Sequence, residues 1–116
     1  MSIVDKTEIA AAEQAASTSV PVYTHTFATP FTHGDKTYEE MAFDFGKLTG
    51  GDCLDIEAEL QMMGKPLIAP EFSGEFLVRM AAKAAGVGAV VLMALPMADY
   101  NRIRSRARSF LLKSGL

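Results

Sequence analysis

The chain has 116 residues, 49% of them apolar, and a formal net charge of −3. This length favours one domain, and the acidic balance argues against a protein whose whole surface binds nucleic acid. The single cysteine, Cys53, excludes an intrachain disulfide and a cysteine-rich metal site, and it fits a reducing, cytoplasmic setting.

The first segment, residues 1–19, is rich in small and polar residues and has few large apolar side chains. It would bury too little apolar surface to offset the entropy lost on ordering, so we predict a flexible tail. It carries acids where a secretion signal needs an apolar run, and the longest apolar stretch, residues 87–98, is too short to span a membrane. A truncation that begins at Val20 is expected to keep the melting temperature of the full chain; a clear drop would mean that the tail packs.

Residues 20–47 have the composition of a β-hairpin. Alternate positions in the second half of this segment are apolar: Met41, Phe43 and Phe45. This period of two is typical of a half-buried strand. Gly34-Asp35 is the expected turn, and Pro30, which lacks an amide hydrogen, should lie at an edge or near the loop. Because a two-stranded hairpin is marginal alone, its apolar face should pack on helices or add to a partner's sheet.

From residue 49 onward the pattern is helical. Thr49 followed three positions later by Asp52 is a start signature related to the capping box. Gly64 and Pro66 indicate the end of this helix. Its expected inward-facing residues are Cys53, Ile56, Leu60 and Met63.

Three further helical pieces are expected before residue 114. The periodicity predicts a second helix over about 71–85, a short buried helical piece over 88–95, and a last helix over about 96–114 that starts at Pro96. The expected buried residues are Phe72, Phe76, Leu77, Met80 and Ala84 in the second helix and Tyr100, Ile103, Ala107, Phe110 and Leu111 in the last. Phe43, Phe45, Leu60, Phe76 and Phe110 should join hairpin and helices. The sequence therefore predicts an α+β fold, an N-terminal β-hairpin packed on three to four α-helices, in a single domain over residues 20–116.

No set of residues in the sequence has the spacing of a catalytic or metal site. The acids Asp52, Asp55, Glu57 and Glu59 fan around a helix, so they are expected to form a solvated face rather than a carboxylate pair or a cation site. His25 and His33 have no second ligand at zinc spacing and are expected to be exposed polar residues of the hairpin. Cys53 is expected to be a small buried side chain. We predict no enzyme activity, cofactor or metal.

The strongest charge feature is the run "NRIRSRARSFLLK". At ~100° per residue in a helix, Arg102 and Arg106 fall on one side of the apolar seam and Arg104 and Arg108 on the other. This spacing suits the docking of an acidic helix, whereas a helix that reads a DNA groove more often presents its cations together. Two adjacent methionines, Met62 and Met63, are further candidates for partner contact, because methionine packs adaptably against varied apolar surfaces.

Three runs of this sequence together resemble the phage tail assembly chaperone family of contractile-tailed phages and prophages. They are "FTHGDKTYEEMAFDFGKLTGGDCLDIEAEL", "APEFSGEFLVRMAAKAAGV" and "ALPMADYNRIRSRARSFLL". The resemblance covers roughly residues 22–113, and its motifs are structural rather than catalytic. It implies a non-enzymatic factor that binds the tape-measure protein, assists tail tube assembly in the host bacterial cytoplasm and is not retained in the mature virion. The tail tube protein and a second copy of the chain are further candidate partners.

Two other functions remain open on the sequence alone. A small DNA-associated regulatory protein would use the basic helix over 100–113, and phosphate binding would then weaken steeply with salt. A minor structural tail protein would use a free edge of the hairpin for sheet addition.

Overall fold

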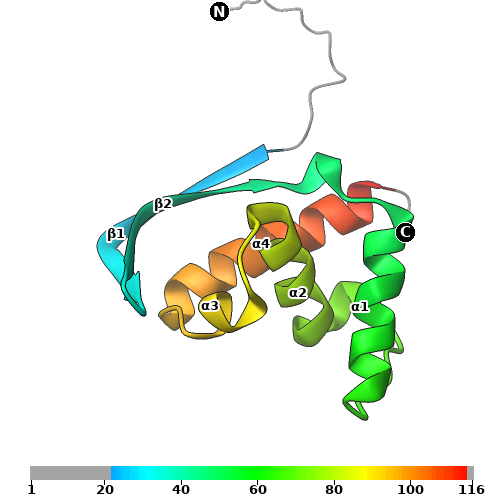
Figure 1. Ribbon diagram of the computed structural model, residues 1–116. Coiled ribbons are helices and arrows are strands. Elements are labelled where there is room, and N and C mark those ends of the chain that lie inside the picture. The colour runs from blue at the N-terminus through cyan, green and yellow to red at the C-terminus, as the bar shows by residue number, and fades with distance from the viewer. Residues whose placement is uncertain (1–21, 115–116) are drawn as a thin grey trace, which may run out of the picture.

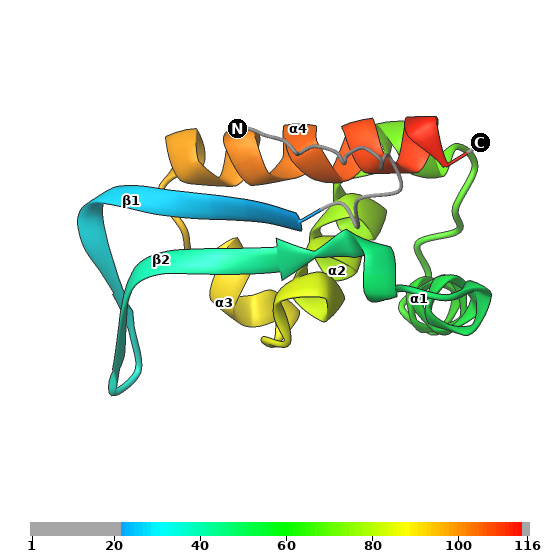
Figure 2. The ribbon, with the colours of Figure 1, turned by 90° about the horizontal axis from the view of Figure 1, so that it is seen from above.

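The computed structural model describes residues 22–114, and the predicted tail over 1–19 lies outside them. The elements follow in the order β1 (Val22–His33), β2 (Lys36–Asp44), the 3-10 turn η3 (Phe45–Lys47), α1 (Gly50–Met62), the 3-10 turn η4 (Pro70–Phe72), α2 (Gly74–Ala85), α3 (Ala89–Met93) and α4 (Met97–Lys113). The hairpin lies along one side of the helices (Figure 1), and α4 runs across the view while α1 is seen end-on in Figure 2. The predicted α+β architecture is confirmed.

The two strands pair antiparallel around the predicted turn. Gly34 adopts φ 64°, a left-handed conformation that glycine tolerates best. Near the turn Thr32 pairs with Thr37. The register shifts between Thr26 and Phe31, in the segment that contains Pro30. Proline is tolerated at such an irregularity because it has no amide hydrogen to donate to a ladder.

The core lies between the inner face of the hairpin and the central helix α2, which contacts α1, α3, α4 and β2. Of the five residues predicted to join hairpin and helices, four are buried: Phe43, Phe45, Leu60 and Phe76. The fifth, Phe110, is half-buried and stacks on Phe45 with ring centroids 5.5 Å apart. The alternating pattern of β2 and the helical spacing of α1, α2 and α4 thus meet in one apolar cluster.

The start of α1 is the predicted capping structure. The Asp52 amide donates to Thr49 Oγ1 at 3.3 Å, and the Thr49 amide donates to Asp52 Oδ2 at 2.8 Å. These two bonds satisfy amides that the helix itself leaves without partners. The bond from the Thr49 amide, together with Lys83, lowers the pKa of Asp52.

Phe72 was predicted to be buried in the second helix, and this is wrong: its side chain is 66% exposed. The helix starts later than predicted, because Ser73 caps it by accepting a hydrogen bond from the Phe76 amide at 3.1 Å. Phe72 therefore belongs to the turn η4 and not to the inward face of α2.

Three smaller predictions also need correction at element ends. Met63 follows α1 as its C-cap residue and is 46% exposed, so it does not join the buried face. The piece over 88–95 is only partly buried, since Val90 is 65% exposed and Leu92 is inside. Pro96 caps α4 from outside, one residue before the helix begins.

His25 was predicted to be exposed on the hairpin, and this is also wrong: it is 1% exposed. Its Nδ1 lies 2.7 Å from the Tyr23 hydroxyl, and its Nε2 lies 2.7 Å from Oδ1 of Asp99 in the first turn of α4. The alternation of β1 places Tyr23, His25 and Phe27 on one face of the strand. A buried polar ring needs hydrogen-bond partners, and α4 supplies one from 74 positions along the chain. His33 is half-buried rather than exposed.

Candidate partner-binding site

The four arginines of α4 lie on opposite flanks of the helix, as their spacing predicts. On one flank, Arg108 Nε donates to the Glu71 carbonyl at 3.1 Å and Arg104 Nη2 lies 3.5 Å from the Phe72 carbonyl. The Arg108 guanidinium also stands over the exposed Phe72 ring, 5.1 Å from its centroid. This pair therefore attaches α4 to η4 while leaving charge at the surface.

The other pair lies beside the start of β1. The Arg106 guanidinium is 4.8 Å from the centroid of the Tyr23 ring, and Arg102 and Arg106 line a shallow hollow of about 290 Å³ together with Tyr23. Within residues 22–114, none of the four arginines forms an ion pair with a carboxylate. Arg79, by contrast, is 6% exposed and is paired with Glu59 and Glu75. The surface of α4 thus offers positive charge on both flanks.

The two candidate methionines at the end of α1 differ in their surroundings. Met62 is 89% exposed. The Met63 sulfur accepts a hydrogen bond from Arg79 Nη2 at 3.4 Å. Met62 is therefore the freer of the two for contact with a partner.

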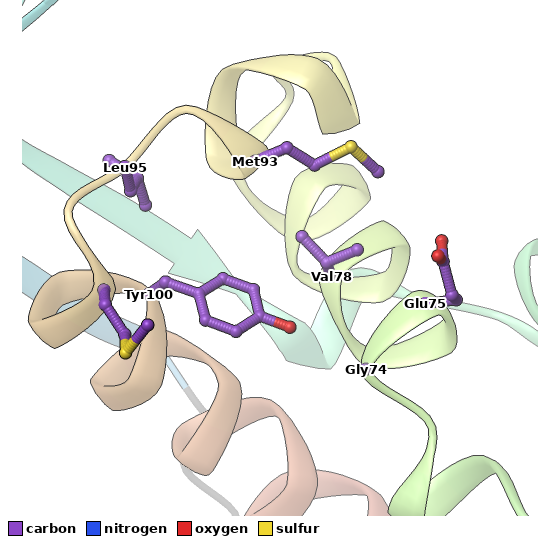
Figure 3. Close-up of a pocket in the computed structure, with 7 residues that line it drawn as sticks. Gly74, Glu75, Val78, Met93, Leu95 and Tyr100 are labelled. Atoms are coloured by element: carbon purple, nitrogen blue, oxygen red, sulfur yellow. The ribbon is translucent and has the colours of Figure 1, made fainter.

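A groove of about 700 Å³ lies where α2, α3 and α4 meet (Figure 3). We call it the methionine groove. The residues that line it are Gly74, Glu75, Val78, Met93, Leu95, Met97 and Tyr100. The buried Val78 and Leu95 form its apolar floor. At its rim, Met93 is 49% and Met97 77% exposed. Flexible thioethers over an apolar floor suit an apolar partner whose detailed shape varies.

Gly74, the first residue of α2, lies at one end of the groove where α4 comes close to α2. A Cβ atom at this position would lie 3.1 Å from the Tyr100 hydroxyl and 3.8 Å from Cζ of Arg104. The glycine therefore lets α4 approach α2 and brings Arg104 beside the groove. Glu75, at the same end, is held by Lys65 at 2.8 Å, and the hydrogen bonds from Lys65 and Arg79 lower the pKa of its carboxyl.

The remaining candidate groups stay apart from this groove. Asp55, Glu57 and Glu59 are exposed, as predicted for a solvated face. Cys53 is half-buried, and burial together with the nearby Glu57 carboxylate raises the pKa of its thiol, which disfavours the reactive thiolate. Among residues 22–114, no three His, Cys, Asp or Glu side chains are grouped to hold a metal ion. In that same part of the chain, no helix has the length and apolar character needed to cross a membrane.

Sequence reasoning missed the methionine groove. Met93 belonged to an almost wholly apolar run predicted as a short buried helical piece, and Met97 and Tyr100 belonged to the start of the last helix. One signal was available: Met97, directly after Pro96, is apolar but does not share the inward face of the last helix, which carries Ile103 and Ala107.

A family model for phage tail assembly chaperone proteins, described as "E, or 41 or 14", matches residues 24–112. The chain belongs to this phage tail assembly chaperone family. The match covers β2, α1, α2 and α3 completely, all but the first two residues of β1 and the last residue of α4, and every residue that lines the methionine groove. Comparison with curated proteins and with solved structures gives no match. The resemblance noted in the sequence is thus confirmed, and the groove and the arginine flanks are features of a tail assembly chaperone.

Proposed function

We propose that this tail assembly chaperone binds helical segments of the tape-measure protein during tail morphogenesis and keeps them in solution until the tube forms around them. The observation that carries the proposal is the methionine groove, whose exposed Met93 and Met97 stand over an apolar floor. A long helical protein exposes apolar stripes before the tube encloses it, and one face of an amphipathic helix fits such a groove. Weak contacts repeated along that length would suffice.

The charges beside the groove indicate which helices fit. Arg104 lies at the Gly74 end, and Arg108 follows one turn further along α4 with the exposed Phe72 beneath it. Glu75 is already paired with Lys65 and Arg79, so it adds little repulsion. The preferred partner is therefore a helix with apolar residues at i, i+3, i+4 and i+7 and acids on one side. Such binding needs no catalysis or cofactor, and we place it in the host bacterial cytoplasm rather than in the mature virion.

Glutamate in place of Met93 and Met97 together is expected to weaken binding at least tenfold, or ~1.4 kcal/mol, because the new carboxylates would be desolvated in an apolar contact. Binding is measured by titrating a labelled helical peptide of the tape-measure protein and by co-purification of the co-expressed pair. Met62→Glu tests the other candidate methionine: it places a carboxylate on a side chain that is 89% exposed and outside the groove. Parental binding by this variant, beside weak binding by the groove variant, would assign the contact to the groove and not to the end of α1.

The two arginine pairs provide a second arm of this experiment. Arg104→Glu with Arg108→Glu should slow association and weaken binding, since this flank borders the groove. Arg102→Glu with Arg106→Glu changes the net charge equally on the other flank and should leave peptide binding unchanged. Circular dichroism and thermal melting verify the folding of both variants, because Arg104 and Arg108 also contact η4 and Arg106 stands over Tyr23. Parental binding by the folded Met93/Met97 variant would exclude the groove and point to the hairpin edge. Salt-sensitive binding of duplex DNA that is lost with Arg102 and Arg106 would instead favour a regulatory protein.

A further inference from the structure

Helix α1 carries a second apolar stripe that faces solvent. Leu54, Ala58 and Met62 follow one another at intervals of four residues, so they share one side of the helix. Leu54 is 66% and Met62 89% exposed, whereas Ile56 and Leu60 on the opposite side are buried. We call these three exposed residues the α1 stripe. Single exposed apolar residues are ordinary, but an aligned set with its own charged borders indicates contact with another surface.

The borders of the α1 stripe are acidic. Asp55 and Glu57 are exposed, one on each side of the stripe, and neither forms an ion pair within residues 22–114. Glu59 lies further round the helix and is engaged by Arg79 at 3.0 Å. A surface that fits this stripe would therefore offer shallow hollows bordered by cations.

The flank of α4 away from the methionine groove has these properties. Its cations are Arg102, Arg106 and Lys113, and all three are exposed. Two hollows lie along it beside Tyr23. One, of about 290 Å³, lies at Arg102 and Ser105, and the other, of about 150 Å³, lies at Ser109 and Lys113.

The spacings of the two surfaces lie within ~3 Å of each other. Leu54 and Met62 are separated by ~12 Å along α1, at ~1.5 Å per residue. The two hollows are centred ~9 Å apart along α4 on the same rise, on either side of Arg106. Two flexible apolar side chains can thus reach two successive hollows while Asp55 and Glu57 face the cations.

We propose that the chaperone associates with itself head to tail, with the α1 stripe of one copy seated on the Arg102–Arg106 flank of α4 in the next copy. The two surfaces lie on different helices, which Figure 2 shows running in different directions. The contact therefore joins two unlike patches. Such a contact can repeat as an open chain of copies, with one unpaired α1 stripe at one end and one unpaired α4 flank at the other. The methionine groove is not part of the contact. A row of copies would therefore present a row of grooves, matched to a long helical partner.

Charge reversal tests this contact without any tape-measure protein. At low salt (~0.05 M) the average molar mass of the parent, measured by sedimentation or light scattering, should rise with protein concentration. At high salt (~0.5 M) this rise should be smaller, because the charges are screened. Asp55→Lys with Glu57→Lys, and separately Arg102→Glu with Arg106→Glu, should each shift self-association to at least tenfold higher concentration. Glu39→Lys with Glu40→Lys on the hairpin is the matched control; it changes the net charge as much as the first variant and should associate like the parent.

Mixing the two reversed variants gives the decisive result. In the Asp55→Lys, Glu57→Lys variant both surfaces are basic, and in the Arg102→Glu, Arg106→Glu variant both are acidic, so copies of the same variant repel each other. Between the two variants, each basic surface meets an acidic one in both contacts of the chain. An equimolar mixture should therefore regain association. A parent that stays monomeric at low salt, or a mixture that stays dissociated, would overturn the proposal. The proposal would also be overturned if the full chain stayed monomeric and only a truncation beginning at Val20 associated. Residues 1–19 of the same chain, and not a second copy, would then cover the α4 flank. Peptide binding in the methionine groove should persist in both reversed variants, which separates this test from that of the proposed function.

Discussion

Replacing Phe76 with alanine is expected to lower the free energy of unfolding by about 3–5 kcal/mol, as for other large aromatic truncations in a core. Phe76 is 1% exposed and lies on α2, the helix that contacts α1, α3, α4 and the hairpin. The substitution removes apolar contacts and leaves a cavity that the surrounding elements fill only in part. The loss is a large share of the stability of a small domain.

Phe72→Ala is the matched control for this measurement. It deletes the same side chain four residues earlier, where the ring is 66% exposed and covered on one side by Arg108. Its cost should stay below about 1 kcal/mol. Both values come from urea denaturation followed by circular dichroism, with equal slopes confirming that the denatured states are comparable. Equal costs for the two variants would contradict the assignment of Phe76 to the core and Phe72 to the surface.

Replacing Asp99 with alanine is expected to cost about 1–3 kcal/mol, because it leaves a buried ring nitrogen of His25 without a partner. The bond from His25 Nε2 to Asp99 Oδ1 is 2.7 Å long and joins β1 to the first turn of α4. His25→Phe should reduce the cost of losing Asp99, since the apolar ring needs no partner and keeps contact with Phe27, now 4.8 Å from the histidine ring.

A double-mutant cycle measures this coupling directly. The free energies of unfolding of the parent, Asp99→Ala, His25→Phe and the double variant should give an interaction energy of at least about 0.5 kcal/mol, the lower end for residues in contact. Additive costs would mean that the pair does not hold the hairpin to α4. Asn101→Ala, on the exposed side of the same helix, is the control and should not couple to His25.

The site was only partly predictable from the sequence. The separation of the arginines into two flanks follows from helical geometry alone, and the structure shows what each flank faces: η4 for Arg104 and Arg108, and Tyr23 for Arg102 and Arg106. Apart from the apolar Met97 directly after Pro96, nothing in the sequence predicted the methionine groove, because it is formed by three helices whose relative placement no local pattern specifies. The exposure of Leu54 and Met62 likewise depends on which side of α1 packs against the core.

The sequence by itself determined the element types, the order of the elements and most of the inward faces. Period-two alternation, the Gly34 turn, the Thr49–Asp52 cap and the helical spacing of α1, α2 and α4 act between neighbouring residues, so they can be deduced without a fold. Only the structure showed that Phe72 is exposed and that His25 is buried. A one-residue cap at Ser73 set where α2 begins, and a carboxylate distant in sequence made burial of an imidazole favourable. The first outcome is a local choice of cap that apolar periodicity does not reveal, and the second depends on which distant groups meet.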